Sequence, residues 1–336
     1  MAVRRIVIHA GHQKTGTTSI QRTLHAGRDK LRRLSVYYPD ESPNHVFLVS
    51  AFHQNPAQLR SNADIPAAAV QARDERMLDG LASFLKKTDC RTALFSSELL
   101  QALDQDAMVR MRDFFARITD DLMVVIYVRH PVAYSQSWAQ ERVKQGAESL
   151  QRLVQRAPCF PYAEKLPQWV NAFGRERIVL RPFETARFKN GDLIEDFIDV
   201  CGLPPIAEWG TPMRVRESLS LPALMLANQL KLAGNGPLHP RTTEVLAEIE
   251  GARFALPPES LDDVRAKSAA DLAYLREEFG IDLADPGDEG IVYRRGNIFS
   301  PEAMRSIAGV LDRLARENAE LRRQLKGGKK RRFEVL

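Results

Sequence analysis

The segment that most constrains the fold of this chain is IVIHAGHQKTGTTSIQ, residues 6–21, in which an apolar run leads through a loop into a helical pattern. Residues 6–8 are uncharged and β-forming, as in a strand that is buried on both faces of a parallel sheet. Gly11 and Gly16 allow backbone angles that other residues resist, and they let the chain approach a ligand closely. The segment therefore predicts a strand, a loop and a helix of an α/β fold.

The loop has the elements of an anion-binding site. A helical pattern restarts at Thr17, with Ile20 and Leu24 four residues apart, so the loop leads directly to a helix N-terminus. Free backbone amides and the helix dipole attract anions at such an end, and Lys14 adds a full positive charge. We therefore expect this loop to bind phosphate.

The position of the lysine indicates what kind of phosphate is bound. Residues 11–18 fit the frame GxxxxGx[ST] of a nucleoside-triphosphate loop, but Thr17 follows the second glycine, where such loops need lysine. Lys14 lies inside the loop instead, so it does not lead the helix toward the β- and γ-phosphates. This departure argues against an ATPase or a GTPase and leaves phosphate binding itself intact.

HAGHQKTGTTS, residues 9–19, resembles the 5′-phosphosulfate-binding loop of sulfotransferases that use 3′-phosphoadenosine 5′-phosphosulfate (PAPS). The resemblance is to bacterial members with a P-loop-like sulfotransferase domain. It implies a three-layer α/β fold with a central parallel β-sheet flanked by helices, to which this chain adds a helical C-terminal extension. It also implies PAPS as cosubstrate without a metal. The residues that it assigns to PAPS binding in this loop are Gly11, His12, Gln13, Lys14, Thr15, Gly16, Thr17 and Thr18.

A second motif follows the most hydrophobic run of the chain, LMVVIYV at residues 122–128, which we expect to form a central strand. Its exit has Arg129 at the strand end, Pro131 at the start of a helix, and Ser137 two turns along. This RxPxxxxxS pattern is similar to the 3′-phosphate-binding element of the same family, which implies that Arg129 and Ser137 contact that phosphate. The planar donor fork of arginine suits the role. A plain ion pair at the strand end is the alternative for Arg129.

Glu98 stands shortly after another predicted strand, residues 92–95, with two serines between them. The C-terminal ends of parallel strands are where open α/β sheets bind ligands. One of the serines can also cap a helix over residues 98–103 whose dipole Glu98 complements, and this structural role is compatible with catalysis. The resemblance implies that a Glu or a His near this strand end removes the proton from the acceptor hydroxyl. Glu98 is the first candidate for that base and His45 is its rival.

The remainder of the chain is less informative about function. Helical patterns over residues 219–232, 242–249 and 260–279 are separated by prolines, and we expect these helices to cover the sheet and the acceptor cleft. Tyr293 to Gly296 resembles the Arg-Lys-Gly loop that reaches the 3′-phosphate in cytosolic sulfotransferases. Arg295 is therefore a further candidate for PAPS binding.

We expect four parts along the chain: a sulfotransferase α/β core over residues 1–205, a helical continuation over 206–300, an amphipathic helix over 301–326, and a basic tail over 327–336. The apolar residues of the amphipathic helix recur near the heptad period. They are Ile307, Leu311, Leu314, Leu321 and Leu325. This helix either docks on its own domain or forms the contact of a homodimer, and the pattern leaves both open. The tail has the composition of a disordered segment.

Composition restricts the class of protein and its location. Of the 336 residues, 44% are hydrophobic and 27% are charged, as in an ordinary globular protein, and no run approaches the about 18 apolar residues of a membrane span. MAVRR leads into a strand without a signal-peptide core, so we expect a cytoplasmic protein without a transmembrane segment. Three separated cysteines indicate neither a zinc site nor a disulfide framework. The net charge of +5 suits an anionic cosubstrate but, being concentrated in the tail, gives little support for nucleic-acid binding.

The sequence therefore predicts an enzyme that moves a sulfuryl group from PAPS to a hydroxyl, or to an amine, of a glycan or small-molecule acceptor. Lys14 and either Glu98 or His45 are the catalytic candidates. A P-loop-type ATP-dependent small-molecule kinase is one alternative. A non-catalytic nucleotide-binding module is another.

Overall fold

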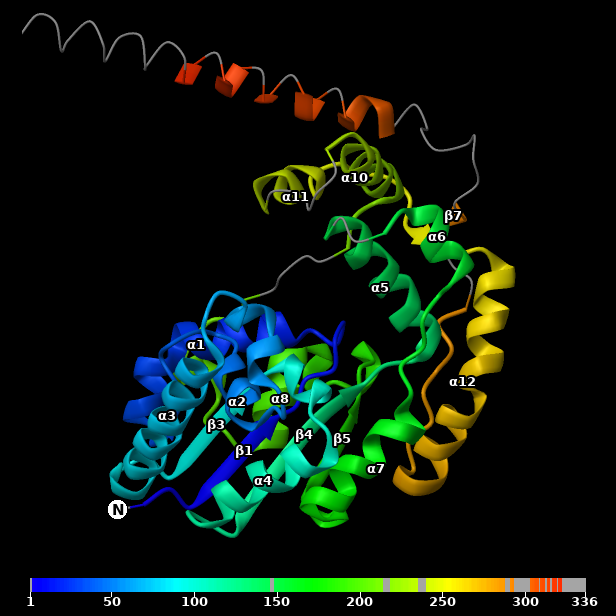
Figure 1. Cartoon of the computed structure of the whole chain (residues 1–336). Helices are drawn as coiled ribbons and strands as arrows, with labels where there is room; N and C mark the ends of the chain where they lie inside the picture. The colour runs from blue at the N-terminus through cyan, green and yellow to red at the C-terminus, as the bar shows by residue number, and fades with distance from the viewer. Residues whose placement is uncertain are drawn as a thin grey trace, which may run out of the picture. The chain divides into compact units, whose positions relative to one another are not determined.

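The computed structural model describes residues 2–145, 148–213, 218–234, 240–287, 291–292 and, except for 308, 312, 315 and 319, residues 303–321 (Figure 1). The chain forms two compact units, and each draws on separate stretches of sequence. The first unit comprises Met1–His130, Phe160–Val215 and Ser268–Ala284, and the second comprises Pro131–Cys159, Arg216–Lys267 and Asp285–Leu336. This grouping differs from the linear division at residues 205 and 300, because the segment after His130 packs with helices that come much later in the chain.

The first unit is built on a five-stranded parallel sheet, which confirms the predicted α/β class. Its strands lie in the order β2-β3-β1-β4-β5, and every neighbouring pair is parallel. Their bounds are β1 Arg5–His9, β2 Val36–Tyr37, β3 Thr92–Ser96, β4 Asp121–Val128 and β5 Ile178–Pro182. The hydrophobic strand β4 is paired on both sides, as expected, although the phosphate-loop strand β1 occupies the middle of the sheet.

Helices cover both faces of this sheet and complete the predicted three layers. Alternate residues of a strand point to opposite faces, so Ile6 and Ile8 of β1 pack into one apolar cluster and Val7 packs into another. The first cluster is covered by α2 Val46–Phe52, α3 Ala67–Lys87, α4 Gln105–Ala116, α7 Tyr162–Phe173 and the second half of α12 Pro258–Phe279. The second is covered by α1 Thr17–Arg33, α8 Leu193–Cys201 and α9 Ile206–Trp209.

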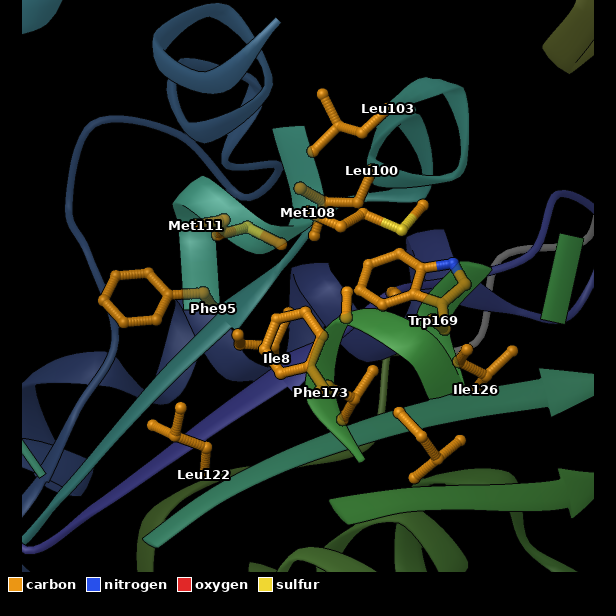
Figure 2. Close-up of a cluster of buried hydrophobic side chains, with 14 of the residues drawn as sticks. Ile8, Phe95, Leu100, Leu103, Met108, Met111, Leu122, Ile126, Trp169 and Phe173 are labelled. Atoms are coloured by element: carbon orange, nitrogen blue, oxygen red, sulfur yellow. The ribbon is translucent and has the colours of Figure 1, made fainter. Parts of the chain in front are cut away.

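The first cluster is rich in aromatic and long aliphatic side chains (Figure 2). Phe95 of β3 and Trp169 and Phe173 of α7 lie in it with less than 2% of their surface exposed. Complete burial of one such side chain stabilises the fold by about 1.5–3 kcal/mol. This packing holds the C-terminal ends of β1, β3 and β4 in place under the loops that follow them.

The connections of the first unit contain six short 3-10 helices. They are η1 Pro56–Gln58, η2 Arg60–Asn62, η3 Glu98–Ala102, η4 Arg175–Arg177, η5 Thr185–Arg187 and η6 Lys189–Gly191. The segment after β3, where the sequence predicts a helix over residues 98–103, is therefore helical but more tightly wound than an α-helix.

A buried ion pair fixes α8 to the sheet. Asp196 of α8 is 1% exposed and accepts hydrogen bonds from the Tyr127 hydroxyl of β4 at 2.7 Å and from the Arg181 guanidinium of β5. The backbone amide of Lys189 also donates to this carboxylate, at 3.1 Å. Because a buried carboxylate needs all its partners, these bonds allow only one docked position for α8.

The second unit is mostly helical and has its own apolar core. It contains α5 Pro131–Lys144, α6 Leu150–Gln155, α10 Leu221–Gly234, α11 Pro240–Leu246 and the first part of α12, with the short parallel strands β6 Phe254–Ala255 and β7 Ile291–Val292. The helices α10, α11 and α12 lie close to the predicted ranges 219–232, 242–249 and 260–279. Residues 303–321 are helical wherever the structure describes them. The other residues of the predicted helix over 301–326, and the tail over 327–336, lie outside the described residues.

None of the helices in the described part of the chain combines the length and the apolar character needed to cross a membrane.

Candidate functional site

The phosphate loop connects β1 to α1 as the sequence predicts, and both of its glycines are required by the local packing. Gly16, the residue before α1, has a φ of 71°, and a Cβ at this position would lie 2.2 Å from Cδ2 of Leu193. A Cβ at Gly11 would lie 2.6 Å from Oγ1 of Thr17. A larger residue at either position would have to displace a neighbouring side chain. The loop backbone therefore packs directly against those side chains.

Two hydrogen bonds within the loop hold it in a tight turn. The carbonyl oxygen of His12 accepts from the hydroxyls of Thr15 at 2.5 Å and of Thr17 at 3.3 Å. Lys14, which is half-buried, stands between these residues with a φ of 65°. A non-glycine residue in this left-handed conformation costs about 1–3 kcal/mol, a strain that concentrates at ligand-binding sites. The internal bonds stabilise this conformation.

The helix that follows the loop begins with Thr17, Thr18 and Ser19, and no acidic residue lies in its first turn. The first amides of an α-helix have no partner within the helix, and its dipole favours anions at this end. Gln13 is exposed and Thr18 is half-buried, so both lie at the accessible side of the loop. The segment therefore has the amides, the hydroxyls and the charge that a phosphate or phosphosulfate group needs.

Arg129, which belongs to the second sequence motif, contacts the loop that forms the first. Its Nη1 donates a hydrogen bond to the carbonyl oxygen of Lys14 at 2.6 Å, across 115 residues of sequence. The guanidinium carbon lies 5.2 Å from the ring centroid of Phe183, a cation–π contact. The Tyr162 hydroxyl accepts from the Arg129 amide and donates to its carbonyl oxygen, both at 2.9 Å. The arginine at the end of β4 is thus held against the phosphate loop.

The other two residues assigned to the 3′-phosphate remain predictions. Ser137 is half-buried on α5, which belongs to the second unit, and Arg295 lies outside the described residues.

Glu98 stands at the same edge of the sheet as the loop. The Ser97 side chain accepts a hydrogen bond from the Leu99 amide at 3.3 Å and so caps η3, which has the half-buried Glu98 as its first residue. Gln101 of η3 donates to the carbonyl oxygen of Ala10 at 2.8 Å and accepts from Nε1 of Trp169 at 3.2 Å. The short helix that carries Glu98 is therefore fastened directly to the start of the phosphate loop.

His45 lies beneath the same edge and is completely buried. Its Nδ1 accepts a hydrogen bond from the Ser96 amide at 2.9 Å, and its own amide donates to the Ser96 carbonyl oxygen at 3.0 Å. Burial lowers the pKa of His45 to about 3. Nδ1 of His45 therefore already has a hydrogen-bond partner at the end of β3.

Three residues that the sequence analysis did not single out form a polar cluster below the loop. His9 Nδ1 lies within hydrogen-bond distance of the Ser96 hydroxyl, at 2.8 Å, and the side-chain amide of Gln21 donates to the same hydroxyl at 3.2 Å. The cluster joins the ends of β1 and β3 to α1, and all three residues are buried. In the sequence, only a polar residue at each of these two strand ends pointed to this cluster. The contact between these residues depends on the pairing of β1 with β3.

Burial lowers the pKa values of the histidines packed around the phosphate loop. Burial lowers the pKa of His9 to about 3 and that of His12 to about 4, and the positive charge of Arg129 acts on His12 in the same direction. The His12 ring lies 3.8 Å from that of Phe160, measured between centroids, and its Nδ1 lies 2.6 Å from the Gln13 carbonyl oxygen, to which it donates. The positive charge at the loop therefore comes from Lys14 and Arg129.

Comparison with known proteins gives matches among solved structures. Neither a protein-family model nor a curated protein matches the chain. A sulfotransferase from Alicyclobacillus acidocaldarius matches at 17% identity and a TM-score of 0.46, over 84% of this chain and 98% of that one. The sulfotransferase domain of the curacin biosynthetic pathway matches at 14% identity and a TM-score of 0.39, over 80% of this chain and 98% of its own length.

A third match is retinol dehydratase, solved in complex with androsterone and the inactive cofactor PAP, at 13% identity and a TM-score of 0.26, over 93% of this chain and 81% of that one. All three TM-scores lie below 0.5. The function is therefore inferred from the residues of this chain.

Proposed function

We propose that this protein is a PAPS-dependent sulfotransferase. The observation that carries the proposal is the hydrogen bond from Arg129 to the Lys14 carbonyl oxygen, which joins the two phosphate-binding motifs of the sequence. PAPS carries anionic groups on both sides of one ribose, so a protein that binds it needs two cationic sites a few ångströms apart. A nucleoside-triphosphate loop has no need for the second site.

The chemistry follows from the roles of the loop and its neighbours. Lys14, the loop amides and the hydroxyls of Thr17 and Thr18 would bind the 5′-phosphosulfate and stabilise the charge that develops on its bridging oxygen. Arg129, together with Ser137, would bind the 3′-phosphate and so fix the position of the donor. This arrangement aligns the sulfur for attack by an acceptor that enters from the opposite side.

Glu98 would complete the reaction by accepting the proton of the acceptor hydroxyl. The acceptor oxygen forms a bond to sulfur while the bond from sulfur to the bridging phosphate oxygen breaks, and both electrons of that bond leave with 3′-phosphoadenosine 5′-phosphate (PAP). We propose a glycan or small-molecule hydroxyl as the acceptor, with an amine as the alternative. We expect no metal to take part, since the phosphosulfate that Lys14 and the loop amides would bind carries a smaller charge than a triphosphate.

Calorimetry with three nucleotides tests the donor site. We expect PAP to bind, AMP to bind more weakly because it lacks the 3′-phosphate, and ATP with Mg²⁺ to bind most weakly. Arg129→Ala should weaken PAP binding by about 10–150-fold, the value of hydrogen bonds to a charged group, and should weaken AMP binding less, since AMP loses only the support that Arg129 gives to the Lys14 carbonyl oxygen. Arg76→Ala, which removes an exposed arginine from α3, is the matched control.

The alternatives give different results in these experiments. A kinase would bind ATP with Mg²⁺ more tightly than PAP. A non-catalytic module would bind PAP but would form no sulfated product from PAPS in a screen of glycan and small-molecule hydroxyls. Equal losses of PAP and AMP affinity in Arg129→Ala would contradict the assignment of Arg129 to the 3′-phosphate.

A further inference from the structure

The described helical residues between 303 and 321, here called the C-terminal helix, carry a regular repeat along one side. Met304, Ile307, Leu311, Leu314, Asn318 and Leu321 are spaced alternately by three and four residues, and all six are helical in the structure. They occupy the a and d positions of consecutive heptads, the positions that face a partner in a coiled coil. In the sequence, Leu325 continues the repeat.

Most of this seam is exposed. The exposed fractions are 51% for Met304, 61% for Leu311 and 59% for Leu321. Ile307, with the neighbouring Val310, packs against the core of the second unit and attaches the beginning of the helix there. Among the described residues, Leu311, Leu314 and Leu321 belong to none of the buried clusters. Contact with its own unit therefore holds the first turns of the C-terminal helix, whereas the apolar seam residues after Ile307 lie outside the described buried clusters.

The composition of the seam indicates what covers it. Asn318 is the one polar residue among the six, at an a position where a buried amide pairs with the same amide of a second helix in a parallel, two-stranded coil. Glu317 precedes it at position g, and in the sequence Arg322 follows five positions later at position e. In a parallel pair, position g of one helix faces position e of the next heptad of its partner, so Glu317, which is also paired with Arg313 of its own helix at 3.0 Å, would attract Arg322 across the seam.

We propose that two copies of this chain associate through their C-terminal helices as a parallel, in-register coiled coil with Asn318 opposite Asn318. A self-complementary seam of this kind closes on a two-fold axis and needs no other protein. Because Ile307 is engaged within its own unit, the free seam is short, and the dimer should therefore dissociate on dilution. The pairing does not depend on the proposed activity.

The mass of the full-length protein, measured by size-exclusion chromatography with light scattering over a range of concentrations, tests the association. We expect it to rise from the 37.9 kDa of one chain toward twice that value. Leu311→Glu should keep the protein monomeric, and far-ultraviolet circular dichroism should show the fold retained. Gly309→Glu adds the same charge outside the seam, where no atom lies within 4 Å of an added Cβ, and should still dimerise.

Cysteine cross-linking tests the orientation. Asn318→Cys should form a disulfide-linked dimer under mild oxidation, because only a parallel, in-register pair brings the two positions within disulfide distance. Glu320→Cys, on the outer side of the same helix, should not. The parent protein provides the baseline for the native cysteines, of which Cys90 and Cys201 are buried.

A protein that is monomeric at every concentration would overturn the proposal. A dimer that survives Leu311→Glu would overturn the assignment of the seam. Equal cross-linking of the two cysteine variants, or none in a protein that dimerises, would overturn the parallel register.

Discussion

Acid should destabilise this protein through the histidines packed around the phosphate loop. His9, His12 and His45 are at most 1% exposed, and burial lowers their pKa values to about 3, about 4 and about 3. Unfolding releases each ring into water, where the ordinary pKa of histidine is about 6.5. The unfolded chain therefore binds more protons than the folded protein below pH 6.5.

The sign and the size of the effect follow from this difference. A pKa that is lowered in the folded state gives stability that is fully present above pH 6.5 and is lost as the pH falls toward the folded value. Each histidine then costs about 1.4 kcal/mol per pH unit. Between pH 7.5 and pH 5.5 the three rings together should lower the free energy of unfolding by about 4 kcal/mol. This is a large part of the about 5–15 kcal/mol that stabilises a typical domain.

Urea denaturation at the two pH values, followed by circular dichroism and fluorescence, measures the difference. His45→Asn retains an acceptor for the Ser96 amide and removes one titrating group, so its loss between pH 7.5 and pH 5.5 should be smaller by about 1 kcal/mol. His53→Asn, in a loop away from the site, is the control and should show the same loss as the parent. If His45→Asn also loses as much as the parent, His45 is not kept neutral by the fold, and the reasoning is refuted.

Three further predictions concern catalysis and the support of the loop. Lys14→Ala should lower turnover of PAPS by about 100–1,000-fold with an unchanged unfolding transition, and near-normal sulfation would remove the central role of Lys14. Glu98→Gln should lower turnover by about 100–10,000-fold while calorimetry still detects PAP binding, and if this variant stays active His45 becomes the candidate base. Asp196→Asn should lower the free energy of unfolding by about 2–3 kcal/mol in urea titrations, because the Arg181 guanidinium loses its charged acceptor; a loss below about 0.5 kcal/mol would contradict the structural role of this pair.

Local patterns in the sequence were enough to place the elements that carry the site. The strand, loop and helix around Lys14 and the strand before Arg129 lie where their apolar periodicity and their glycines and prolines indicate. These features depend on residues that are close in the sequence. The hydrogen bond from Arg129 to Lys14 agrees with two motifs that were each recognised separately.

Features that depend on contacts between residues far apart in the sequence could not be predicted from such local patterns. His45 is hydrogen-bonded to Ser96, 51 residues away, and Ser96 also contacts His9, 87 residues away. The sequence around a histidine next to a strand end does not indicate whether its ring faces a substrate or a backbone amide. The grouping of α5 with α10 likewise depends on which apolar faces meet, and the sequence shows only that each helix has one.

The contact between Gly16 and Leu193 has a consequence for the dynamics of the loop. The side chain of Leu193 occupies the space where a residue at position 16 would have its Cβ, so one wall of the loop is supplied by the first residue of α8. Local opening of α8 would remove this wall and expose the loop amides to hydrogen exchange without global unfolding. The affinity of the loop for an anion is then limited by the docking of α8, which is fixed by Asp196, three residues after Leu193 on the same helix. Substitutions within α8 should therefore lower or raise the affinity of the loop for an anion while every residue of the loop itself stays the same.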